Sequence, residues 1–142
     1  MTISSKQGRI ALAALVSAAG LAGCGEVVST NKFKGAEHEV AARISNFQKH
    51  VEQASQKKIC SEDLAAGLVA RIDASGKPYG KDCEAALKEQ LKNVEDETLT
   101  VDTVTVHGKD ATAGVKSVEY GKSVPKTLTL VKEANGWKIS GV

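Results

Sequence analysis

The chain has 142 residues, of which 42% are hydrophobic, 4% aromatic and 25% charged. Its net charge of +2 includes Lys6 and Arg9, which lie in an N-terminal segment that we expect to be removed, so 17 basic side chains then balance 17 acidic ones. This balance excludes the basic surface that nucleic-acid binding requires, so we expect no nucleic-acid partner.

The first 23 residues have the pattern of a secretory signal peptide. Lys6 and Arg9 supply a positive start, and an apolar run from Ile10 to Ala19 follows. This run has the length of a signal core and is shorter than the roughly 20 apolar residues that span a bilayer. We therefore expect residues 1–23 to be a signal that directs the chain out of the cytoplasm.

The signal ends in Leu21-Ala22-Gly23-Cys24, which resembles the lipobox of bacterial lipoproteins. The resemblance implies that the Cys24 thiol receives diacylglycerol and that the chain is cut before Cys24. One acyl chain holds a protein at a membrane marginally, whereas two hold it stably. We expect an extracytoplasmic protein anchored to the cell membrane by lipid, the alternative being a plain secreted protein with a fortuitous Cys24.

Two cysteines remain after lipidation, Cys60 and Cys83. In an oxidising compartment an even pair predicts a disulfide. A zinc site is disfavoured because neither cysteine has a histidine close in the sequence, and a redox dithiol favours the Cys-x-x-Cys spacing. We expect no metal and no cofactor.

The 119 residues left after cleavage suit one domain, with residues 24–35 as a tether and residues 36–142 as the folded part. Helical periodicity covers about Gly35 to Lys58, with the apolar stripe Val40, Ile44, Phe47, Val51 and Ala54. A second helix is expected to begin at Ser61 as N-cap, and residues 73–80 are expected to form a loop. A third helix is expected after Asp82 as N-cap.

Strand patterns follow from about Glu97 onward. Leu99 and Val101 alternate in one phase and Val104 in the other, which predicts a β-bulge near Asp102-Thr103. A second change of phase is expected before Val118. Asn135-Gly136 predicts a hairpin, and Trp137 after it is expected to be a core anchor. The predicted fold class is α+β, with a long N-terminal helix and two short helices packed on a curved antiparallel sheet of about four strands.

This order of elements, ending in Gly136-Trp137-Lys138-Ile139, resembles the nuclear-transport-factor-two-like superfamily. The segment from Val104 to Ala113 resembles the first long hairpin of its small secreted members, and the two cysteines resemble a pattern in bacterial lipoproteins of this group. The resemblance implies a sheet curled around the long helix into a cone with a pocket. The superfamily includes isomerases, dehydratases and binding domains, so the fold transmits no function.

The sequence contains no Gly-rich phosphate loop, no Gly-x-Ser-x-Gly and no His-Glu-x-x-His. The three histidines do not cluster, and all three are expected to face solvent, although His50 lies beside the helical stripe. Ketosteroid-isomerase-like relatives use an aspartate base and a tyrosine. The matching catalytic candidates here are Asp102 and Tyr120. The alternative interpretation is that both side chains face water.

We therefore expect a membrane-anchored envelope lipoprotein with a non-enzymatic domain that binds an envelope protein partner or a small apolar ligand. The alternatives are a small cone-pocket hydrolase or isomerase with Asp102 as base, and a lipid-handling factor. An inward-pointing Asp102 would favour the enzyme, and an open apolar cavity would favour a ligand or lipid binder.

Overall fold

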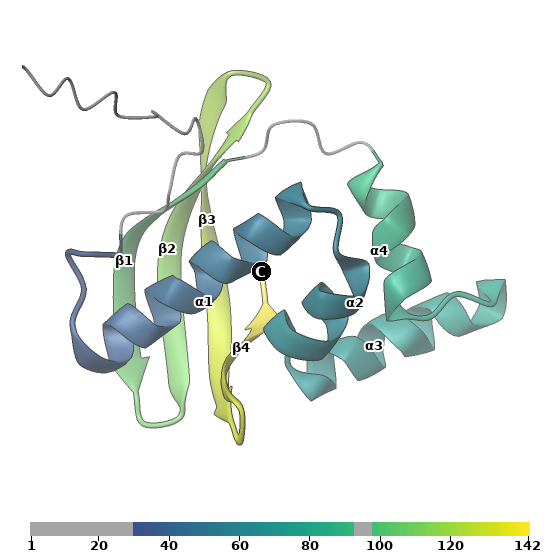
Figure 1. Ribbon diagram of the computed structural model, residues 1–142, viewed down its shortest axis with the longest axis horizontal. Coiled ribbons are helices and arrows are strands. Elements are labelled where there is room, and N and C mark those ends of the chain that lie inside the picture. Colours follow the sequence, from purple (N-terminus) through teal and green to yellow (C-terminus); the bar gives the residue numbers. More distant parts are fainter. Residues whose placement is uncertain (1–29, 93–97) are drawn as a thin grey trace, which may run out of the picture.

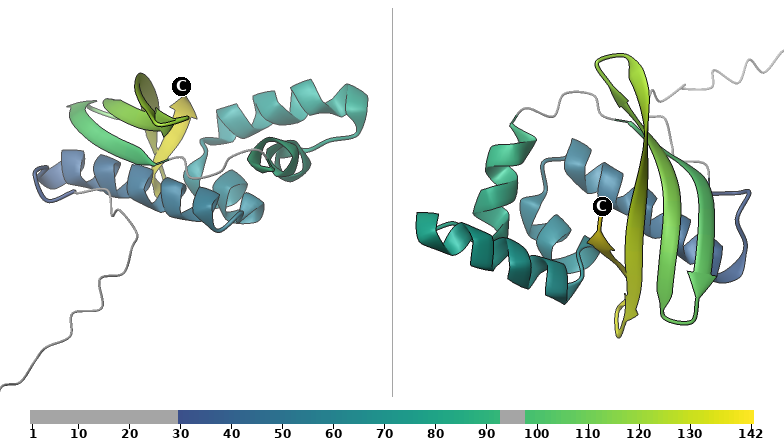
Figure 2. Two further views of the ribbon diagram at one scale, coloured as in Figure 1. Left: turned by 90° about the horizontal axis from the view of Figure 1, so that it is seen from above. Right: turned by 180° about the vertical axis from the view of Figure 1, so that it is seen from behind.

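The computed structural model describes residues 30–92 and 98–142. Its main body has two layers, with helix α1 (Gly35–Glu52) lying across one face of an antiparallel sheet (Figure 1). Helices α3 (Ala66–Gly76) and α4 (Cys83–Leu91) lie beyond the β4 edge of that sheet, as both views of Figure 2 show. This arrangement confirms the predicted α+β class, with its long helix, short helices and four strands.

The sheet is a meander in which each strand pairs with the next one along the chain, in the order β1-β2-β3-β4. The strands are β1 (Leu99–His107), β2 (Asp110–Glu119), β3 (Lys122–Glu133) and β4 (Gly136–Gly141). The hairpin predicted at Asn135-Gly136 joins β3 to β4 and is confirmed. Short connections of this kind fix the register of neighbouring antiparallel strands.

The predicted bulge in the first strand is present. Pairing of β1 with β2 shifts between Val101 and Thr103, so Asp102 is the extra residue. Gly114 faces Thr103 across this bulge, and a Cβ atom added to Gly114 would lie 2.6 Å from the Thr103 Oγ1 atom. A larger residue here would therefore force the Thr103 side chain to shift, which explains the glycine opposite the bulge.

The second change of phase, expected before Val118, is wrong. Strand β2 pairs with β3 without any shift from Asp110 to Glu119. The inward positions continue through Ser117, which is fully buried, while Val118 is 41% exposed. A serine thus takes an inward position that the apolar pattern had assigned to the next valine.

The core lies between α1 and the inner face of the sheet. Val40 and Ile44 of the predicted helical stripe are fully buried, and Trp137 is 3% exposed, which confirms it as a core residue. Its indole Nε1 donates a hydrogen bond to the Glu39 carboxylate at 3.2 Å. The sheet contributes the inward residues Val101, Val104, Ala111, Ala113, Val115, Leu128, Leu130 and Ile139.

The first helix ends earlier than predicted. Helix α1 stops at Glu52, and Ala54 adopts a left-handed conformation with φ of 48°. A one-turn helix α2 (Gln56–Lys58) follows and continues into a π-helical turn, η1 (Ile59–Asp63). A non-glycine residue with positive φ is uncommon, and no glycine or proline marks this break in the sequence.

The expected N-cap at Ser61 is also wrong, because Ser61 lies inside η1 and its hydroxyl donates to the Lys57 carbonyl at 2.8 Å. Helix α3 instead follows Ala65, whose amide donates to the Ile139 carbonyl of β4. The expected loop over residues 73–80 contains the end of α3 and a 3₁₀ turn, η2 (Lys77–Tyr79). Asp82, in contrast, caps α4 as predicted, accepting a hydrogen bond from the Ala85 amide at 2.9 Å.

Candidate functional site

A cavity of about 180 Å³ lies between the last turns of α1, the end of α4 and the inner face of the sheet. Its walls combine six aliphatic or aromatic side chains with one amide, one lysine and the final residue of the sequence. The lining residues are Phe47, Gln48, Val51, Leu91, Leu99, Val115, Lys126, Leu128 and Val142.

The apolar walls come from positions that the sequence pattern already assigned to the interior. Phe47 and Val51 continue the stripe of α1, and Leu91 ends α4. These three side chains are only half-buried although they pack against the core. The second half of the helical stripe therefore faces a cavity, whereas the first half is covered by the sheet.

Gln48 is the amide in the lining, and both of its polar atoms bond within the protein. Its Nε2 donates to the Glu52 carboxylate at 2.9 Å, and its Oε1 accepts from the Leu99 amide at 3.1 Å. The second bond ties α1 to the start of β1. Gln48 thus holds two walls of the cavity together, which explains why this polar side chain is 4% exposed.

Lys126 is the one lining residue in the described ranges with an ionisable side chain. It lies on β3 directly opposite Val115 of β2, so its side chain starts from the inner face of the sheet. The side chain is half-buried and interacts with another group of the protein. A lysine therefore borders a largely apolar space.

A second polar feature is a largely buried cluster of hydrogen-bonding side chains, formed by Arg43, His50 and Asp63. The carboxylate of Asp63 is fully buried and accepts from Arg43 Nη1 at 2.8 Å through Oδ1. Its Oδ2 lies 2.7 Å from His50 Nδ1. Both partners come from α1, whereas Asp63 ends η1, so the cluster fastens η1 to α1. It does not line the cavity.

Hydrogen bonds and a disulfide also fasten η1 to β4 and to α4. The buried amine of Lys138 on β4 donates to the carbonyls of Ser61 and Glu62. Cys60 forms a disulfide with Cys83 at the start of α4, so the predicted pairing is present in the structure. The π-helical turn is consequently bonded to α1, to β4 and to α4.

The two catalytic candidates lie away from the cavity. Asp102 is at the β1 bulge with its side chain 37% exposed, and Lys116 Nζ lies 2.8 Å from its carboxylate. The hydrogen bond from Lys116 holds the pKa of Asp102 below its usual value. Tyr120 is fully exposed in the turn between β2 and β3, with φ of 49°. The structure does not bring the two together around a substrate.

Of the three histidines, His38 and His107 are exposed as expected. The expectation for His50 is wrong, because His50 is 9% exposed and bonded to Asp63. The break after α1 that brings Asp63 to His50 contains no glycine or proline, so this contact was not predicted. The spacing of Arg43 and His50 on one helix was the available signal, because residues seven apart lie on the same face.

Cys24 and the signal segment lie outside the described residues. Within residues 30–92 and 98–142, no helix is long and apolar enough to cross a membrane. Histidine, cysteine, aspartate and glutamate side chains in those ranges form no group of three or more that would hold a metal ion.

No model of a known protein family matches the sequence, and no curated protein matches it. Among solved structures, the chain is similar to a protein of Campylobacter jejuni provisionally designated an NTF2-like transpeptidase. That match has 17% identity and a TM-score of 0.45, and it covers 72% of this chain and 95% of the other. An NTF-2 like protein of unknown function from Silicibacter pomeroyi matches with 11% identity and a TM-score of 0.35, covering 69% and 91% of the two chains. Both neighbours are NTF2-like, but at these scores they transfer no function, so the functional argument depends on this chain's own residues.

Proposed function

We propose that this protein is an envelope lipoprotein, anchored to the membrane through Cys24, whose single domain binds a small apolar ligand without transforming it. The apolar cavity between α1, α4 and the sheet is the observation that carries the binding function. The anchoring half of the proposal is supported by Leu21-Ala22-Gly23-Cys24 and the signal pattern before it.

The chemistry of the cavity favours an apolar ligand. Seven lining side chains are hydrocarbon, and the polar atoms of Gln48 already bond to Glu52 and Leu99. Each methylene group that leaves water for such walls gains about 0.8 kcal/mol. The volume of about 180 Å³ is below the roughly 300–1,000 Å³ of pockets for drug-sized molecules. It is close to the ~150 Å³ of an apolar cavity that holds benzene.

The positions of the catalytic candidates support binding over catalysis. An enzyme with Asp102 as base needs its carboxylate within hydrogen-bonding reach of the substrate. Asp102 is instead paired with Lys116 and does not line the cavity, and neither does Tyr120. The enzyme hypothesis is thereby left without the two residues on which it was built.

The test is native mass spectrometry of the protein isolated from its own host, compared with two variants. Val51 lines the cavity, so Val51→Phe fills part of it. Leu87 is also half-buried on a helix and packs against the core, but it does not line the cavity, so Leu87→Phe is the matched control. We expect a co-purified small molecule on the native protein and on Leu87→Phe, and a loss of that molecule from Val51→Phe. Retention of the ligand by Val51→Phe would place binding elsewhere.

A further inference from the structure

We propose that the ligand is a single-chain amphiphile with an anionic head group, whose alkyl end enters the cavity and whose head binds Lys126. This inference rests on the proposed binding function and adds the chemical class of the ligand. It combines three observations: the register of Lys126, the size of the cavity, and the polar bonds that Gln48 already makes.

Lys126 lies at an inward-facing position of β3, which is unusual for a lysine. Its pairing partner Val115 is 2% exposed, and its neighbour at the next inward position of β3, Leu128, is 4% exposed. A lysine between such residues lays its methylene chain on apolar surface and turns its amine toward water. Lys126 lines the cavity, so this register favours an ionised ligand group beside its amine at the edge of the cavity, where that group would remain hydrated.

The size of the cavity limits what is buried. About 180 Å³ accommodates a short hydrocarbon segment and leaves no room for two full acyl chains. The polar end of any longer ligand therefore remains at the opening. Because the cavity is lined by hydrocarbon, an ionised head is excluded from its interior by the cost of losing hydration.

Lys126 is the lining side chain whose charge matches such a head. The polar atoms of Gln48 are bonded to Glu52 and Leu99, and the other lining side chains of the described part of the chain are apolar. Lys126 already interacts within the protein. An ammonium group carries three donors, so it can hold an anion beside an existing partner. A carboxylate or phosphate matches this charge, whereas a cationic head is repelled by it.

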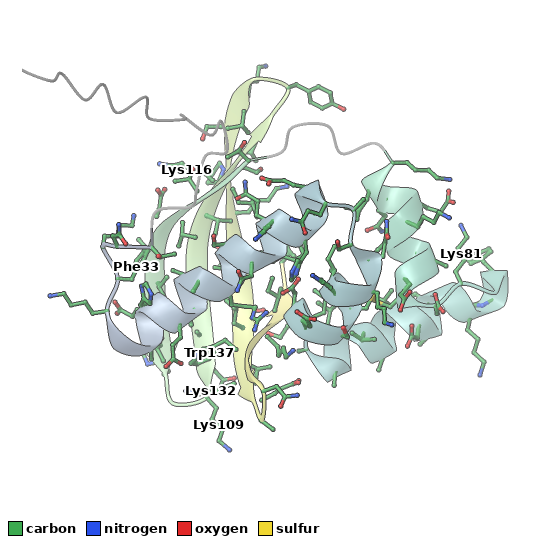
Figure 3. The ribbon with its side chains drawn as sticks, in the orientation of Figure 1. Phe33, Lys81, Lys109, Lys116, Lys132 and Trp137 are labelled. Atoms are coloured by element: carbon green, nitrogen blue, oxygen red, sulfur yellow. A yellow bond between two sulfur atoms is a disulfide. The ribbon has the colours of Figure 1, made fainter. Side chains whose placement is uncertain are left out.

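The test measures binding of octanoate and of its neutral counterpart octanamide by isothermal titration calorimetry. The protein is isolated from its host and kept in phospholipid nanodiscs, and empty nanodiscs correct for uptake by lipid. Two variants each lose one positive charge: Lys126→Gln at the cavity, and Lys109→Gln in the β1–β2 turn. Figure 3 shows Lys109 at the far end of the sheet, pointing away from the molecule, which makes it the matched control.

We expect the native protein to bind octanoate about tenfold more tightly than octanamide, as one charge-assisted hydrogen bond provides. Lys126→Gln should remove this preference by weakening octanoate binding much more than octanamide binding, and Lys109→Gln should keep the preference. Equal binding of both probes, or a preference that survives Lys126→Gln, would overturn the inference while leaving the proposed function intact. Absence of binding by both probes, combined with native protein that carries no small molecule, would overturn the inference and the proposed function together.

Discussion

Replacing Asp63 by alanine is the most direct test of how the helical segments are fixed to the body of the protein. The Asp63 carboxylate is fully buried and is shared between Arg43 and His50. Its removal leaves both partners of α1 without their acceptor and frees η1 from α1. The same segment carries Cys60, so α4 loses part of its support even though the disulfide remains.

The size of the effect follows from the burial of the three groups. Removing one partner from a buried ion pair costs about 3–5 kcal/mol, because an uncompensated charge stays inside the protein. The side chains of Arg43 and His50 are 19% and 11% exposed, so water can partly hydrate these two groups after they lose the Asp63 carboxylate. We therefore expect the lower end of this range, about 3 kcal/mol.

Urea unfolding followed by circular dichroism measures this loss. With a slope of about 1–3 kcal/mol per molar urea, the midpoint should fall by roughly 1–3 M at an unchanged slope. Glu89→Ala is the control, because Glu89 also pairs with a cation, Lys92, but on the surface. It should leave the midpoint unchanged, since exposed pairs contribute little. A loss below about 1 kcal/mol for Asp63→Ala would refute the view that the cluster is what fastens η1.

Three further outcomes test separate parts of the molecule. Cys24→Ala should move the protein from the membrane fraction to the soluble fraction, and unchanged partitioning would rule out lipid anchoring. Replacing Cys60 and Cys83 together by serine should lower the free energy of unfolding by about 3 kcal/mol, because the bond closes a loop of intermediate length; an unchanged denaturation midpoint would contradict this. The carboxyl of Asp102 should titrate below the usual aspartate range by NMR, because Lys116 stabilises its charged form. Its contribution to stability is then present above the unfolded-state pKa and is lost as the pH falls through the folded-state pKa. Lys116→Met should return the titration to the usual range, and a midpoint that stays low in that variant would assign the shift to another group.

The elements with strong local signals were predictable from the sequence. The bulge after Val101, the cap at Asp82 and the hairpin at Asn135-Gly136 each follow from a change of phase or a residue type with a known conformational preference. These signals act over a few residues, so neighbouring sequence is sufficient to determine them.

The errors have a common cause, which is that tertiary contacts outweigh local preference. The serine at 61 is a good N-cap, but the disulfide at Cys60 and the bonds from Lys138 to the carbonyls of η1 place it inside a π-helical turn. Ser117 occupies an inward position because the unbroken pairing with β3 leaves no alternative. Contacts of this kind join residues far apart in the chain, and the sequence pattern near each residue does not contain them.

The candidate site was also predictable only in part. Its apolar walls were predictable, since Phe47, Val51 and Leu128 belong to amphipathic patterns. The cavity itself was not predictable. Whether these apolar residues enclose a cavity with Lys126 at its border depends on how far α1 and α4 lie from the sheet. Spacing of this sort is set by packing across the whole domain, which explains why the sequence suggested a pocket only through a resemblance.

The position of the disulfide within α4 has a mechanical consequence. Cys83 is the first residue of the helix and Leu91, which forms part of the cavity wall, is the last. The two are separated by about 12 Å at a rise of 1.5 Å per residue. The disulfide therefore restrains the end of α4 that is remote from the cavity, and a tilt of α4 by about 10° about that end would displace Leu91 by about 2 Å. A change in the tilt of α4 would thus alter the width of the cavity at Leu91 more than the position of the disulfide.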